Sequence, residues 1–148
     1  PGETIAERVL TIREVIRAQD LDVLVIALGT NDARMVFDSG TSLADGWYVT
    51  QASAFTALAD AQAVPCVVWV GVNANSKKWH IDFWGGGFNE WLVRYTKVAD
   101  WTAYSKGRPE WFEADTIHLT GSGADAYARL ITETIDAQCP VAGPGPVL

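Results

Sequence analysis

The sequence predicts a single α/β domain built on a parallel sheet. Two continuous apolar runs, "DVLVIAL" at 22–28 and "CVVWVGV" at 66–72, are typical of strands that are covered on both faces. Segments with helical spacing of apolar residues lie before, between and after these runs. An alternation of helix and strand favours parallel strands joined by right-handed crossovers.

The first half of the chain contains two predicted helices and two predicted strands. Residues 3–18 carry five apolar residues at helical spacing, and Glu3 suits the first turn, where the helix dipole favours acids. The apolar run that follows is bounded by Gly29. Residues 44–63 read as a second helix, which Val64-Pro65 ends before the second strand begins at residue 66.

The second half is predicted to begin with a polar and aromatic loop at 73–87. A third helix is expected at 88–96, a short third strand at 97–102 and a last helix at 121–138. We therefore expect one domain at 1–139 and a Pro/Gly-rich tail at 140–148. The carboxyl ends of parallel strands gather functional groups at one edge of the sheet. This rule directs attention to the residues that follow each strand.

Composition excludes some partners. The chain has 148 residues, with 11 basic and 18 acidic side chains and a net charge of −7. Nucleic acid and anionic membrane surfaces need a basic face, so neither is expected as the main partner. No apolar run approaches the roughly 18–20 residues of a membrane helix, and no signal peptide is predicted from the residues given. A chain that starts at Pro1 is expected to be a processed, trimmed or partial product.

The cysteine and histidine counts bear on redox state and metal binding. Cys66 and Cys139 form either one bridge in an exported protein or two unrelated thiols, and the sequence leaves both open. The unusual start, the potential bridge and the tail favour a secreted or extracytoplasmic protein. Two histidines and two cysteines at these spacings do not make a ligand set, so neither a metal nor another cofactor is expected.

Asp115 and His118 form the first candidate catalytic pair. They lie three residues apart in "ADTIHLTGSG", immediately before the last predicted helix. A carboxylate that accepts a hydrogen bond from one imidazole nitrogen fixes the tautomer, which frees the other nitrogen to take a proton from a nucleophile. The competing interpretation is an Asp cap beside a surface histidine.

Two further stretches could contribute hydrogen-bond donors. In "ALGTND" a turn after the first strand exposes the amide of Asn31, which can stabilise a developing oxyanion, while Asp32 is expected to brace the loop. In "PGET" Gly2 can bring its backbone N–H close to a ligand before a helix N-terminus. An Asx turn at Asn31 and a plain turn at Gly2 are the alternatives.

Taken in order, "PGET", "GTND" and "DTIHL" resemble the SGNH (GDSL-type) hydrolase family over nearly the whole chain. The resemblance implies a flavodoxin-like three-layer α/β/α sandwich and ester hydrolysis through a Ser-His-Asp triad. Carried over by position, Gly2 and Asn31 correspond to the second and third oxyanion-hole donors. His118 corresponds to the general base and Asp115 to its orienting acid.

The residues given do not contain the serine nucleophile at the position that the family pattern requires. Its serine lies in a Gly-Asp-Ser turn after a first strand, upstream of the "PGET"-like block, and none of the six serines here follows a strand in such a turn. The resemblance therefore implies that the first strand of the sheet is missing from this chain. We expect the N-terminal segment that carries the nucleophile to exist as a separate peptide or chain, as a cleaved part of the precursor, or as an omitted part.

The substrate is expected to be a small acyl ester, for example an O-acetylated carbohydrate. Trp79 and Trp84 in the aromatic loop could stack on sugar faces, and Asn73 follows the second strand at the same edge. Thioesters, lysophospholipids and acyl transfer stay open within the family. An alternative function is a non-catalytic, SGNH-like glycan-binding module, and a third interpretation is an unrelated α/β domain in which the motifs coincide.

Overall fold

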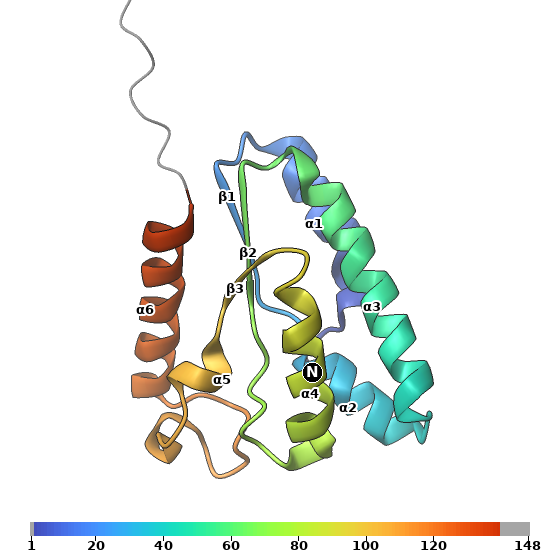
Figure 1. The fold of residues 1–148 in the computed structure, drawn as a ribbon, viewed down its shortest axis with the longest axis vertical. Coiled ribbons are helices and arrows are strands. Elements are labelled where there is room, and N and C mark those ends of the chain that lie inside the picture. Colours follow the sequence, from blue (N-terminus) through green and yellow to red (C-terminus); the bar gives the residue numbers. More distant parts are fainter. Residues whose placement is uncertain (1, 140–148) are drawn as a thin grey trace, which may run out of the picture.

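The computed structural model describes residues 2–139 as an open parallel sheet with helices on both faces (Figure 1). The strands β1 (Val23–Ile26), β2 (Cys66–Val70) and β3 (Lys97–Ala99) lie in the order β1-β2-β3. Val23 is paired with Cys66 across the first pair, and Val68 with Lys97 across the second. The predicted α/β sandwich is therefore confirmed.

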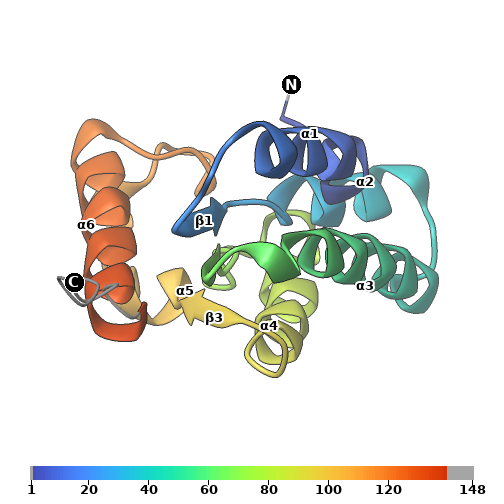
Figure 2. The same cartoon turned by 90° about the horizontal axis from the view of Figure 1, so that it is seen from above.

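The helices fill the connections between strands and cover the sheet. They are α1 (Ile5–Ala18), α2 (Thr30–Ser39), α3 (Leu43–Asp60), α4 (Ile81–Leu92), α5 (Trp101–Tyr104) and α6 (Gly121–Gln138), with the 3-10 turns η1 (Ala61–Ala63), η2 (Lys78–His80) and η3 (Pro109–Trp111). Figure 2 shows α6 on one side of the sheet and α1, α3 and α4 on the other. None of the described helices has the length and apolarity to span a bilayer.

The central strand β2 divides the core into two clusters. Its side chains alternate, as strand geometry requires, so Trp69 packs with α1, α3 and α4 while Val68 and Val70 pack with α6. All three side chains are buried. Cys66 at the start of β2 forms a disulfide with Cys139, 73 residues away, so the end of α6 is covalently tied to the sheet.

Helix starts follow the local chemistry of the sequence. Thr4 and Glu7 form a capping box at α1, in which the Thr4 backbone N–H donates to Glu7 Oε2 at 2.7 Å. Ser42 caps α3 and Thr120 caps α6 through their hydroxyl oxygens. The last helix occupies residues 121–138, as predicted. The predicted tail at 140–148 lies outside the described residues.

The prediction of a loop at 73–87 and a helix at 88–96 is wrong in its boundaries. Helix α4 begins at Ile81 and ends at Leu92, so Gly85, Gly86 and Gly87 lie inside it. A Cβ on Gly85 would collide with the Val72 side chain. Glycine therefore lets the helix pack closely, and tertiary packing outweighs the low helix propensity that led to the loop prediction.

A second correction concerns the segment after β1. The sequence suggested a turn around Asn31, whereas the structure has the helix α2 from Thr30. Gly29 has a φ of 125°, a conformation that favours glycine, and it makes the abrupt change from strand to helix. The third strand is also shorter than expected, because α5 begins at Trp101.

Strand β1 has an open edge within the described part of the chain. Its only strand neighbour is β2, and its residues, all apolar, are partly exposed except for Ile26. The opposite edge strand β3 carries Lys97, a charge that discourages edge-to-edge pairing, but β1 carries none. A hollow of 220 Å³ runs along this edge between α1 and β1.

We predict that amides on the open edge of β1 exchange hydrogen much faster than those of β2. In a strand with one neighbour, about half of the backbone N–H groups have no ladder partner, whereas β2 is paired on both sides. Native-state hydrogen exchange followed by NMR measures both strands in one sample. Uniform protection along Val23–Ile26 would contradict an open edge.

Candidate active site

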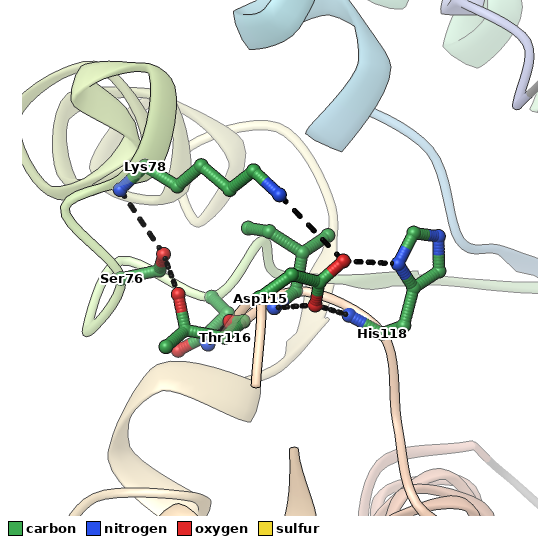
Figure 3. Close-up of polar contacts among 7 residues, drawn as sticks. Ser76, Lys78, Asp115, Thr116 and His118 are labelled. Atoms are coloured by element: carbon green, nitrogen blue, oxygen red, sulfur yellow. Dashed lines mark hydrogen bonds and ion pairs between the residues drawn. The ribbon is translucent and has the colours of Figure 1, made fainter. Parts of the chain in front are cut away.

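Asp115 and His118 meet in a tight turn just before α6. Asp115 Oδ1 accepts the backbone N–H groups of Ile117 and His118, each at 2.9 Å. Its Oδ2 lies 2.5 Å from Nδ1 of His118 (Figure 3). The three-residue spacing thus brings carboxylate and imidazole together. This is the geometry in which the acid sets the orientation of the ring.

The hydrogen bonds to Asp115 favour its ionised form. The backbone N–H of His118, then that of Ile117 and then the imidazole hold the pKa of the Asp115 carboxyl well below its usual range. The carboxylate is therefore charged across the physiological range. An anion in contact with Nδ1 favours a proton on that nitrogen and stabilises the imidazolium.

Residues 76–78, which lead into η2, brace this turn. Lys78 Nζ lies 3.6 Å from Asp115 Oδ2, and Ser76 Oγ is hydrogen-bonded to Thr116 Oγ1 at 2.7 Å (Figure 3). Thr116 has a φ of 62°, and the η2 residues Trp79 and His80 also have positive φ. These residues are the non-glycine positions with positive φ in the described chain. Strain of this kind concentrates at functional sites.

His118 is available for proton transfer. Its side chain is 76% exposed, against 29% for Asp115. Within residues 2–139, Nε2 of His118 has no hydrogen-bond partner, since the contact of the ring is made through Nδ1. A free, exposed imidazole nitrogen opposite an anchored one is the arrangement that a general base requires.

Asp32 anchors the second group of predicted site residues. Its carboxylate is buried and accepts the backbone N–H of Ile5, with the shorter contact at 3.1 Å. The start of α1 is therefore fastened to the start of α2. As a result Gly2 lies against Asn31, so closely that a Cβ on Gly2 would collide with the Asn31 amide. The expected role of Asp32 as a brace is confirmed.

A cavity at the carboxyl ends of the strands is lined by sequence neighbours of both groups, although Gly2, Asn31, Asp32, Asp115 and His118 do not line it themselves. This cavity of 150 Å³ is lined by Thr30 of α2 and by Ile117 and Leu119, which flank His118. Asn73 lines it too, but its amide is engaged: Nδ2 donates to the Thr116 carbonyl and Oδ1 accepts the Asn75 N–H. Asn73 therefore supports the Asp115 turn.

The two tryptophans that were predicted to bind substrate, Trp79 and Trp84, lie in different surroundings. Trp79 is half-buried beside the turn, with the Arg34 guanidinium 5.5 Å and the Lys78 ammonium 4.8 Å from its ring centroid. Trp84 is buried in α4 and stacks on Phe88. The expectation that Trp84 projects from a loop is wrong, because α4 turns this side chain into the core.

Within residues 2–139, none of the six serines is hydrogen-bonded to the imidazole of His118. Ser39 and Ser53 donate to backbone carbonyls of their own helices, and Ser76 is hydrogen-bonded to Thr116. Ser42 caps α3, Ser105 is buried and accepts from Asn75, and Ser122 pairs with Thr120. Sequence inspection did not single out Lys78, Ser76 or Thr116. Their contacts depend on η2 folding back onto a turn some 40 residues later, for which the sequence carries no local signal.

Residues 2–139 contain no group of three or more acidic, histidine or cysteine side chains placed to hold a metal ion.

Among solved structures, an acetyl xylan esterase variant from Geobacillus stearothermophilus is similar to this chain. The TM-score is 0.69 at 16% sequence identity, and the match covers 97% of this chain and 72% of the esterase. No protein-family model matches the sequence. No curated protein sequence matches it either. At this identity the likeness shows that the two proteins share an esterase-like α/β/α fold.

We predict that Asp32→Asn removes a pH dependence of stability. Burial raises the pKa of Asp32 to about 6, opposed by the hydrogen bond from Ile5. In the unfolded chain the carboxyl titrates near pH 4, so between pH 4 and 6 the native state binds more protons and loses stability as the pH rises. Relative to Asp32→Asn, the free energy of unfolding of the wild type should fall by about 3 kcal/mol between pH 4 and pH 6. The amide retains an acceptor for Ile5.

Urea unfolding of both proteins at pH 4, 5, 6 and 7.5 measures this difference directly. At each pH the two proteins differ in one carboxyl group, that of Asp32. The difference between their free energies of unfolding therefore isolates its contribution. A difference in unfolding free energy that stays constant, or that moves in favour of the wild type as the pH rises, would contradict the account.

Proposed function

We propose that this chain is the base-and-oxyanion part of a serine-type carboxylic ester hydrolase. The observation that carries the proposal is the Asp115–His118 pair, with Nδ1 anchored and Nε2 free. In the proposed reaction, Nε2 of His118 accepts the proton of a serine hydroxyl as its oxygen attacks the ester carbonyl. The imidazolium then gives that proton to the leaving alcohol. Water hydrolyses the acyl-enzyme with the help of the same base.

Gly2 and Asn31 are the proposed oxyanion donors. The backbone N–H of Gly2 and the side-chain amide of Asn31 are neighbours, because Asp32 holds the starts of α1 and α2 together. Donors fixed before the reaction stabilise the tetrahedral oxyanion without reorganisation. Each such donor is worth roughly 3–4 kcal/mol of barrier.

We propose that the nucleophilic serine belongs to a segment outside residues 2–139, either as a peptide or as a separate chain. The support is the edge of β1, where an apolar hollow is lined by Ile12 and Val15 of α1 and by residues 24–28. An added parallel strand would pair with β1 and fill this hollow. Its carboxyl end would lie beside Leu28, which also lines the cavity formed in part by Ile117 and Leu119, the residues on either side of His118.

The proposed substrate is a small acyl ester carried by a carbohydrate. Two observations support this substrate. The structural neighbour is an acetyl xylan esterase, and Trp79 lies close to the Asp115 turn, because the Lys78 ammonium contacts both the Trp79 ring and the Asp115 carboxylate. Aromatic rings of this kind stack on the apolar faces of sugars.

We propose that the protein is exported, because the Cys66–Cys139 disulfide would persist in an oxidising compartment.

Substitution of each histidine in the complete natural protein tests this function. We expect His118→Ala to lower kcat for p-nitrophenyl acetate and for acetylated xylo-oligosaccharides by at least about 10³-fold, because the base is lost. Asp115→Asn should cost up to about 10⁴-fold, since an amide favours the wrong tautomer. The matched control is His80→Asn, which removes the other imidazole. Asparagine tolerates the φ of 55° at that position, so activity should be retained.

Two results would overturn the proposal. Turnover that survives His118→Ala would remove its role as the base. Saturable glycan binding by a complete protein that hydrolyses no ester would favour the alternative, a non-catalytic SGNH-like glycan-binding module.

A further inference from the structure

Two cations meet at the ring of Trp79, beside the candidate active site. The Arg34 guanidinium carbon lies 5.5 Å and the Lys78 ammonium 4.8 Å from the ring centroid. Both distances are typical of a cation–π interaction. Arg34 is exposed on α2 and Lys78 is half-buried in η2, so two segments that are distant in the sequence bring their charges to one ring. In a chain with a net charge of −7, this is a local concentration of positive charge.

Each cation lies next to one part of the proposed catalytic machinery. Lys78 Nζ and His118 Nδ1 contact the same carboxylate oxygen, Oδ2 of Asp115 (Figure 3). Arg34 follows the proposed oxyanion donor Asn31 by three residues on α2, and residues with this spacing are neighbours on a helix surface. One charge is therefore close to the proposed base, and the other is close to the proposed oxyanion donor.

Both cations retain hydrogen-bond donors that no group in residues 2–139 uses. Arg34 donates through Nε to Asp38 Oδ2 at 3.1 Å, while its Nη atoms form no hydrogen bond or ion pair with these residues. The 3.6 Å from Lys78 Nζ to Asp115 is longer than a hydrogen bond, and within the same range this ammonium has no hydrogen-bond acceptor. The Arg34–Asp38 pair is exposed, and such pairs are weak, so an anionic ligand can compete for the guanidinium.

We propose that Arg34 and Lys78 bind a carboxylate on the carrier sugar, so that the substrate is an acylated glycan that contains a uronic acid. This inference rests on the proposed function and names its substrate class. A guanidinium binds a carboxylate through two parallel N–H groups, which the Nη atoms of Arg34 can supply. A neutral sugar would leave both cations without an anion from the ligand. A phosphate, with nearly two charges, would be repelled by the ionised Asp115 more strongly than a carboxylate.

A carboxylate held at this place would also orient the ester. The cations come from α2 and η2, the same segments that carry Asn31 and contact the Asp115 turn. A uronic acid bound between them would hold the neighbouring acylated sugar close to Asn31 and His118. Fixing the ester near both groups before the reaction lowers the entropic part of the barrier. Arg34 and Lys78 would thus determine which acylated sugars react.

Isothermal titration calorimetry of the complete natural protein tests the proposal with matched ligands. One pair is xylotriose that carries a glucuronic acid, and the same oligosaccharide with its carboxylate reduced to an alcohol. Trigalacturonate and its carboxyl-reduced form are the second pair. We expect the acidic member of at least one pair to bind at least about tenfold more tightly than its neutral form. Raising the NaCl concentration from about 0.05 M to about 0.5 M should weaken the binding of the acidic member, because salt screens exposed charges.

Substitution of Arg34 locates the charge that selects the ligand. Arg34→Gln should weaken binding of the acidic oligosaccharide about tenfold and leave the affinity for its neutral form unchanged, because only the charged donors are lost. Arg34→Lys, which keeps the charge but not the planar donors, should lie between the two. The matched control is Arg108→Gln. Arg108 is also exposed, lies 5.4 Å from the ring centroid of Trp111 and pairs with Glu110, so its loss should leave the affinity of the acidic ligand unchanged.

Equal affinity for the acidic and neutral members of both pairs would overturn the inference. So would an Arg34→Gln protein that binds the acidic ligand as the wild type does, or the absence of binding to either acidic ligand at millimolar concentration. The test needs no turnover. Charge-selective binding by a protein that hydrolyses no ester would contradict the proposed enzyme but leave this site standing, whereas an active esterase without this preference would refute only the site.

Discussion

The carboxylate of Asp115 is the point on which the candidate site depends. It accepts two backbone N–H groups and the Nδ1 side of the His118 ring, and it pairs with Lys78. The backbone contacts form the turn, the ring contact orients His118, and the ion pair draws η2 toward the turn. Because three of these contacts are hydrogen bonds to a charged acceptor, they are individually stronger than neutral ones. Without the carboxylate, the histidine would be an unoriented surface side chain.

Two aspartates serve this site in opposite environments. Asp115 lies in a turn rich in donors and is kept ionised. Asp32 is buried, so desolvation favours its protonated form, and it serves by fastening α1 to α2. The first orients the imidazole of His118, and the second holds Gly2 against Asn31, the two proposed oxyanion donors. The fold brings both to the carboxyl end of the sheet, where parallel α/β proteins commonly place their ligands.

Sequence reasoning succeeded where the signal was local. The last helix was predicted at residues 121–138, the bounds that α6 has, and the two apolar runs predicted β1 and β2. It failed where tertiary packing decides: the glycines of α4 suggested a loop, although Gly85 is needed for contact with Val72. Asp115 and His118 could be paired from their spacing. The contribution of Lys78 could not, because it follows from the way η2 is folded over the turn.

The central claim is that His118 serves a serine that is supplied from outside residues 2–139, and covalent labelling tests it most directly. The natural protein would be treated with a serine-directed phosphonate, and its intact mass and labelled peptides would be determined under denaturing conditions. The account predicts one adduct, on a serine of a companion peptide or of additional chain, and no adduct in the His118→Ala protein, because the serine is then not activated. An adduct on one of the six serines of this chain, or none on an active protein, would contradict it.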